Sequence, residues 1–174
     1  IVVYIYMFSS FLRVHATFSG YTEIALGSAL VFGIKLPENF KNPFLALSIQ
    51  EFWQRWHLSL SSFITRNIYL PILLKTKKRR LTLFSAFTIV GLWHNFSLNY
   101  LFWGMGHGLA LVVHGEWVKS EYRKSILKNP SLHLAWSFVA WLLTMSCVSY
   151  LSMFANLPTF SDSVNFTLSL CGVK

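Results

Sequence analysis

The sequence predicts an all-α, polytopic membrane protein with short, tilted or re-entrant helices around a central funnel. Its 174 residues are 54% hydrophobic and 12% charged, whereas soluble domains are about 45–50% apolar and about 25% charged. Residues 81–113 contain no Lys, Arg, Asp or Glu. Residues 135–154 are a second uncharged stretch, long enough to span a bilayer once because a spanning helix needs about 20 apolar residues. We therefore expect residues 1–174 to form a single membrane domain.

The beginning of the chain is expected to hold incomplete or short membrane helices. Residues 1–12 are typical of the end of a spanning helix, and residues 18–23 introduce a polar break. Residues 24–34 are apolar, but a helix of this length measures about 16 Å, which is short for a hydrocarbon core of about 30 Å. We expect this helix either to span half of the membrane or to extend backward through Tyr21. The chain starts without Met, a basic segment or a cleavage site. These features favour a fragment of a larger membrane protein.

Residues 37–43 are predicted to form a loop, since Pro stands at both ends of this segment and disfavours helix in the preceding residue. A helix is then expected from about residue 49 to residue 68. Ser48 and Glu51 have the spacing of a capping box, which starts a helix by satisfying its first amides. Residues 69–71, Tyr-Leu-Pro, are expected to end it.

The spacing of three to four residues places one set of side chains on a common face of this helix. The set is Trp53, His57, Leu60, Ser61 and Ile64. Glu51 and Arg55 are four residues apart, which suits an ion pair. We interpret the helix as amphipathic and not spanning, with His57 directed into a protein-lined funnel.

Residues 81–113 are too long for one straight span, at about 50 Å, and too short for two full ones. Residues 95–99 break the run near its middle. Basic residues dominate both flanks, at 75–80 and at 116–128, so the positive-inside rule places both on one side. We expect two short arms whose bend carries His94 into the membrane. Irregular backbone at that depth is tolerated beside a cavity, so the bend is expected to border one.

The end of the chain is expected to contain one clear span followed by a loop. Residues 156–158, Asn-Leu-Pro, end the apolar stretch 135–154, and residues 161–174 are predicted to be exposed. Cys147 and Cys171 lack the spacing of a disulfide framework or a metal site. The net charge of +9 comes from clusters with apolar flanks and no recognition module, so we expect no nucleic acid partner.

Histidines within the membrane segments are the first candidates for function. Ionisable groups at membrane depth are costly and usually face a partner, a cavity or a substrate path. A neutral His94 can accept a hydroxyl proton as a general base, and a packing role is the alternative. For His57 the alternatives are substrate binding and a place among the lipid headgroups; for His107, between two Gly, they are substrate binding and helix contact.

Metal binding and an aromatic tunnel are further interpretations of these residues. Trp53, Trp56, Trp93 and Trp103 suit either a substrate tunnel or an interfacial aromatic belt. The three histidines have no accompanying carboxylate within the membrane run and no HExxH motif. We expect no metal and no bound cofactor.

Five motifs follow one another over more than half of the chain. They are FSGYTEIALG at 18–27, PENF at 37–40, EFWQRWHLSLS at 51–61, GLWH at 91–94 and WGMGHG at 103–108. In order and spacing they resemble the membrane-bound O-acyltransferase family, in particular its alginate O-acetyltransferase branch, with the D-alanyl-lipoteichoic acid transfer protein as a relative. The resemblance covers about residues 18–114, which would be the catalytic core.

The resemblance implies transfer of an acyl group from a cytoplasmic thioester, acetyl-CoA or an acyl carrier, to a hydroxyl of an extracytoplasmic polysaccharide or a periplasmic acceptor protein. It implies a multi-pass protein of the bacterial inner membrane, in contact with the lipid bilayer. It identifies His94 as the general base and His57 as the second histidine of the catalytic site. The expected substrate-binding residues are Trp53, Arg55, Trp56, Ser61, Trp93, Asn95 and His107.

The chain departs from the family pattern at a few positions. Asn67 stands where Asp is frequent, Leu73 and Leu74 replace a common Gly pair, and Asn95 replaces a usual Gly. Acetyl transfer to an exopolysaccharide is the first expectation, and D-alanyl transfer to teichoic acid is the second. A transporter or flippase segment and a catalytically silent scaffold remain alternatives from other functional classes.

Overall fold

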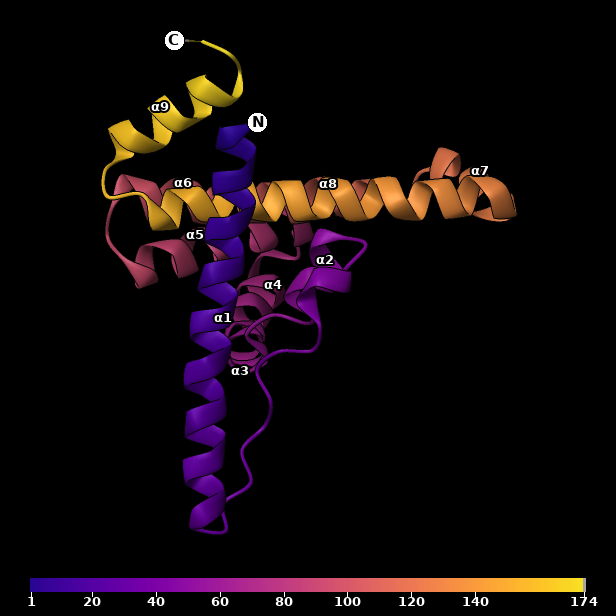
Figure 1. Ribbon diagram of the computed structural model, residues 1–174. Coiled ribbons are helices and arrows are strands. Elements are labelled where there is room, and N and C mark those ends of the chain that lie inside the picture. The colour runs from indigo at the N-terminus through magenta and orange to yellow at the C-terminus, as the bar shows by residue number, and fades with distance from the viewer. Residues whose placement is uncertain (174) are drawn as a thin grey trace.

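The computed structural model describes residues 1–173 and contains no strand within them, which confirms the all-α prediction. The helices are α1 (Val2–Val31), α2 (Ile49–Trp53), α3 (Leu58–Ile64), α4 (Leu70–Thr76), α5 (Arg79–His94), α6 (Leu98–Trp117), α7 (Glu121–Lys128), α8 (Pro130–Asn156) and α9 (Phe160–Leu170). A 3-10 turn at Pro43–Leu45 precedes α2, and a π-helical turn at Thr65–Tyr69 joins α3 to α4. Figure 1 shows α1 crossing α8 steeply, with α2 to α4 beside them.

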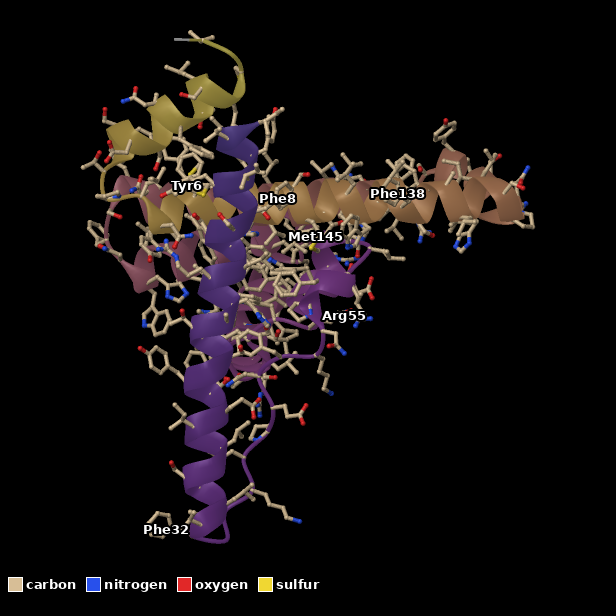
Figure 2. The ribbon with its side chains drawn as sticks, in the orientation of Figure 1. Tyr6, Phe8, Phe32, Arg55, Phe138 and Met145 are labelled. Atoms are coloured by element: carbon tan, nitrogen blue, oxygen red, sulfur yellow. The ribbon has the colours of Figure 1, made fainter. Side chains whose placement is uncertain are left out.

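Helix α1 is continuous for 30 residues, so the polar break expected at residues 18–23 is wrong. The hydroxyls of this segment are satisfied inside the helix: Ser19 Oγ donates to the Ala16 carbonyl at 3.3 Å and Thr22 Oγ1 to the Ser19 carbonyl at 2.8 Å. Such back-bonding lets Ser and Thr stay in a helix. The half of α1 that ends beside Phe32 extends away from the other helices (Figures 1 and 2).

The single helix expected over residues 49–68 is broken into α2, α3 and the π-helical turn. Ser48 caps α2 as predicted, because its hydroxyl accepts from the Glu51 amide at 3.1 Å. The Glu51 carboxylate accepts from the Leu47 amide at 2.8 Å, one residue before the position that a capping box requires. The expected ion pair with Arg55 is confirmed at 2.7 Å.

Two further features of this segment differ from expectation. His57 lies between α2 and α3 in the left-handed region, at φ 47° and ψ 58°, and this conformation stops the helix. The helix end expected at residues 69–71 is wrong, because α4 continues from Leu70 to Thr76. Pro71 is tolerated because it lies in the first turn of α4, where an amide donor is not needed by the helix.

Helices α5 and α6 form an antiparallel hairpin, which confirms the predicted break in the uncharged run. Glycines allow the two backbones to touch: a Cβ added to Gly91 would lie 3.1 Å from the Gly104 Cα. At the open end, Arg80 and Glu116 form an ion pair at 2.7 Å. The two basic flanks are therefore close together, as expected, while the depth of the hairpin in a membrane stays a prediction.

Helix α8 is the one helix in residues 1–173 that is long and apolar enough to cross a membrane. It contains the whole stretch 135–154 and ends at Asn156, as predicted. The expectation of a loop after residue 161 is wrong, because α9 occupies Phe160–Leu170. A capping box between Thr159 and Asp162 starts α9; Lys174 lies outside the described residues.

The core lies where α1, α2, α6 and α8 meet. Phe11 of α1, Phe52 of α2 and Met145 of α8 are buried, with exposed fractions of 4% or less. The Trp56 ring stacks on Phe52, with centroids 5.4 Å apart. This aromatic core fixes the short helix α2 against the long helices and thereby places the residues that follow it.

Candidate active site

A cavity of about 210 Å³ lies between the helices α1, α5, α6 and α8 and the α2–α3 segment. It brings together His57, His94 and His107, which are far apart in the sequence. The aromatic side chains in its wall include Phe18, Trp53, Trp56, Tyr100 and Trp103. The cavity that the sequence predicted beside the hairpin bend is therefore present, with His57 directed toward it as expected.

His57 is held at the turn between α2 and α3 by polar contacts on one edge of its ring. Its Nδ1 lies 3.3 Å from Asn39 Oδ1 and 3.4 Å from Ser59 Oγ. The Phe18 ring packs edge-on against it, with centroids 4.7 Å apart. Burial, with a smaller contribution from nearby His94, lowers the pKa of His57 to about 4. The ring is therefore neutral near pH 7 and able to accept a hydrogen bond.

His94 is the last residue of α5 and lies at the hairpin bend. Its ring packs at right angles to Trp103, with centroids 5.6 Å apart, and lies 5.0 Å from the ring of Trp93. The residue remains exposed among the described residues. A histidine that is oriented by aromatic rings and open to a cavity can meet a substrate hydroxyl.

His107 is buried, with 2% of its surface exposed. Its ring lies between Trp53 and Trp103, with centroid distances of 5.1 and 4.7 Å. Its Nδ1 has no hydrogen-bond partner within residues 1–173. His107 therefore belongs to the aromatic wall of the cavity, and its substrate-binding role stays a prediction.

A second cavity, of about 600 Å³, lies on the other side of Trp53. Arg66 and Arg79 contribute to its wall together with Ser61 and Gln50. Trp53 lines both cavities. A smaller histidine-lined cavity and a larger cavity that carries two cationic side chains therefore share the Trp53 side chain in their walls.

Four of the predicted substrate-binding residues lie outside the histidine-lined cavity. Arg55 bonds to Glu51 and to the Lys41 carbonyl at 3.2 Å, and Figure 2 shows it at the outer edge of the molecule. The Ser61 hydroxyl donates to the Trp53 carbonyl at 3.2 Å, which fixes the α2–α3 turn. Trp93 is 68% exposed, and Asn95 is also exposed. Ser61 lies in the wall of the larger cavity, whereas the predicted roles of Arg55, Trp93 and Asn95 gain no support from this placement.

Three residues of this region, Asn39, Ser59 and Tyr100, had no role expected from the sequence. Asn39 and Ser59 contact His57, and Tyr100 lines the cavity. Asn39 belongs to the motif PENF. A polar residue in a motif without an assigned function was the one feature of the sequence that could have identified Asn39 as a candidate. Within residues 1–173, no three His, Cys, Asp or Glu side chains are grouped so that they could hold a metal ion.

Comparison with known proteins gives one family. The sequence profile of the membrane-bound O-acyltransferase family matches residues 1–155. The peptidoglycan O-acetyltransferase of Helicobacter pylori is 32% identical over 165 residues, which cover 93% of this chain and 30% of the relative.

Two further relatives have names that indicate other polymers. The probable alginate O-acetylase AlgI of Pseudomonas fluorescens is 34% identical, over 79% of this chain and 28% of the relative. The teichoic acid D-alanyltransferase of Bacillus subtilis is 31% identical, over 66% of this chain and 32% of the relative. The chain thus spans about a third of the length of the curated relatives it matches.

Proposed function

The chain belongs to the membrane-bound O-acyltransferase family, and from this premise we propose that the protein transfers an acyl group from a thioester to a hydroxyl of a cell-envelope polymer. One observation carries the proposal: His57 and His94 line the same cavity although they come from different parts of the chain. A neutral histidine in a partly enclosed cavity is the group that alcohol activation requires.

His94 acts as the general base in this proposal. The acceptor oxygen attacks the thioester carbonyl while His94 takes the hydroxyl proton. The C–O bond of the ester forms, the C–S bond breaks, and the proton passes from His94 to the leaving sulfur. His57 is neutral near pH 7, so it orients the acceptor hydroxyl or stabilises charge that develops beside His94.

The larger cavity is proposed as the place where the donor enters. Arg66 and Arg79 in its wall suit the phosphates of acetyl-CoA or of a carrier's phosphopantetheine. Arg79 belongs to the basic flank at residues 75–80, which the positive-inside rule assigns to the cytoplasm. Trp53 lines both this cavity and the histidine-lined cavity, so the thioester end of a donor would pass its indole ring.

Acetyl is the acyl group favoured by two of the three named relatives, which are called O-acetyltransferase and O-acetylase. We propose an extracytoplasmic polysaccharide as acceptor, directly or through a periplasmic acyl-acceptor protein, and a multi-pass location in the bacterial inner membrane. D-alanyl transfer to teichoic acid is the second candidate, supported by the Bacillus subtilis relative.

The test is acyl transfer from labelled acetyl-CoA to envelope polysaccharide, measured in cells that make the intact protein. His94→Ala is expected to reduce transfer by roughly 10²- to 10⁴-fold, which is the usual contribution of a general base. His57→Ala is expected to reduce it less. His133→Ala, an exposed histidine of α8 outside the histidine-lined cavity, is the matched control and keeps wild-type transfer.

Wild-type transfer in the His94 variant, at equal membrane levels, would overturn the catalytic assignment. Movement of substrate across the membrane without formation of an ester would support the transporter alternative instead. Transfer of labelled D-alanine but not of acetyl would identify D-alanyl, and not acetyl, as the transferred group.

A further inference from the structure

We propose that Asn39 is a positioning residue that holds His57 in one tautomer, with the proton on Nδ1 and the lone pair of Nε2 facing the cavity. The inference rests on the proposed function, which requires a neutral His57 at this place. It assigns a role to the loop before α2, whose residues lie outside the cavity wall. Asn39 acts through His57 and does not itself meet the substrate.

The orientation of the Asn39 amide follows from its neighbour Ser59. The Ser59 backbone N–H lies 3.2 Å from the Asn39 side-chain atom assigned as Oδ1. A backbone N–H can only donate, so the Asn39 atom that faces it must be the acceptor oxygen and not the NH₂ group. The orientation of the Asn39 amide is therefore fixed by the Ser59 backbone N–H, which can act only as a donor.

The tautomer of His57 follows from the same oxygen. Ser59 Oγ lies 2.7 Å from Asn39 Oδ1 and uses its one proton in that bond. His57 Nδ1 therefore faces two oxygens with lone pairs, at 3.3 and 3.4 Å. The lone pair of an unprotonated Nδ1 would repel the lone pairs of both oxygens, whereas a protonated Nδ1 donates its hydrogen to them. The proton is on Nδ1, and Nε2 is left with its lone pair.

The direction of Nε2 follows from the shape of the imidazole ring. His57 lines the cavity, while Asn39 and Ser59 are absent from its wall. The Nδ1 edge therefore faces the loop, and the opposite edge, which carries Nε2, faces the cavity. The left-handed backbone of His57 makes this orientation possible. His is among the residue types enriched in that conformation.

The loop stays in place without the Asn39 side chain, because backbone groups also hold it. The Leu58 amide donates to the Asn39 carbonyl at 3.0 Å, and the Lys41 amide donates to the Arg55 carbonyl at 2.9 Å. Phe40 packs edge-on against Trp56, with centroids 5.0 Å apart. A change confined to the Asn39 side chain should therefore alter the His57 proton more than the fold.

The first test is the pH dependence of acyl transfer from labelled acetyl-CoA by the intact purified protein. Asn39→Asp keeps the acceptor oxygen but places a negative charge beside Nδ1–H, which favours the imidazolium form. We expect the acid limb of the rate profile to move upward by on the order of one pH unit or more, with activity recovered at higher pH. His94 of α5, and Tyr100 and His107 of α6, are the other titratable groups of the cavity, and His15 of α1 lies beyond Trp56.

The second variant removes the acceptor altogether. Asn39→Leu is expected to lower kcat by roughly 10- to 100-fold, as loss of a partner that orients a histidine does at metal sites, without a shift of the acid limb. Glu38→Gln changes the charge of the same loop at an exposed residue and is the matched control with wild-type activity. Wild-type rates and pH profiles in both Asn39 variants would overturn the proposal.

A third measurement does not depend on catalysis. Ring ¹⁵N resonances of histidine distinguish the two neutral tautomers, and a His57→Gln sample identifies the His57 signals. A protonated Nδ1 in wild type that changes in Asn39→Leu supports the inference, and a protonated Nε2 in wild type contradicts it. Should transfer prove independent of His94 and His57, the proposed function fails while this spectrum still reports on Asn39.

Discussion

The two histidines of the proposed site reach their cavity by different means. His94 ends α5, and its position depends on close backbone packing in the α5–α6 hairpin, where glycines let the helices touch. His57 lies between two short helices in a left-handed conformation, and hydrogen bonds from a loop hold it. The hairpin side should therefore be sensitive to added volume, and the loop side to lost polar groups.

Added volume in the hairpin should have the largest effect on stability. Gly91→Ala would place a methyl group against the Tyr100 carbonyl oxygen and within 3.1 Å of the Gly104 Cα. Because the obstacles are backbone atoms that cannot rotate away, we expect a loss of about 1–3 kcal/mol in the free energy of unfolding. Denaturant unfolding of the purified protein in detergent measures it.

The matched control is Gly115→Ala on α6, where an added Cβ meets no atom within 4 Å. This variant should be more stable than wild type by about 0.5–1 kcal/mol, because Ala is the better helix former. Equal destabilisation by both variants would show that close packing of the hairpin is not what Gly91 provides.

Loss of a polar group on the loop side should have a smaller effect. Ser48→Ala removes the hydroxyl that accepts from the Glu51 amide at the start of α2, and loss of such a cap costs about 1 kcal/mol. The thermal unfolding midpoint should fall. Ser28→Ala, at an exposed position inside α1, is the control and should leave the midpoint unchanged or slightly raised. A fall of the same size in both variants would contradict a specific role for the cap.

The smallest effect is expected at the open end of the hairpin, outside the uncharged run. Hydrogen bonds from Arg80 and Lys119 lower the pKa of Glu116 to about 2. A lowered carboxylate pKa adds stability above the unfolded-state pKa of about 4.3, and this contribution is lost as the pH falls through about 2. The pair is exposed, so screening by solvent keeps its contribution small.

Unfolding midpoints of wild type and Glu116→Gln, compared across this pH range, check the prediction. The advantage of wild type should shrink between about pH 4 and pH 2, since the unfolded carboxylate takes up a proton there while the folded carboxylate stays ionised down to about pH 2. Glu23→Gln removes an exposed carboxylate that belongs to no ion pair in residues 1–173 and serves as control. An advantage of wild type that grows on acidification would contradict the sign.

Much of the secondary structure follows from local patterns in the sequence. The absence of charge predicted α8, the polar break at residues 95–99 predicted the hairpin, and Ser48 predicted the start of α2. Two failures have physical reasons. Hydroxyls that bond back within α1 do not interrupt it. The helix after α2 is split by the left-handed backbone of His57, and the helical spacing of the side chains around His57 did not indicate this break.

Some of the functional residues can likewise be identified from the sequence, and others depend on the tertiary structure. His57 and His94 stand out in the sequence because an ionisable group in an apolar segment is costly, and this holds whatever the fold. The sequence also contains the hairpin glycines, the basic flanks and the motifs of the family. Only the packing of the helices decided that both histidines line one cavity, that Arg55 and Trp93 lie outside it, and that Asn39 faces His57 from 18 residues away. Such contacts depend on turns and on close packing between distant segments, and a pattern along one segment does not encode them.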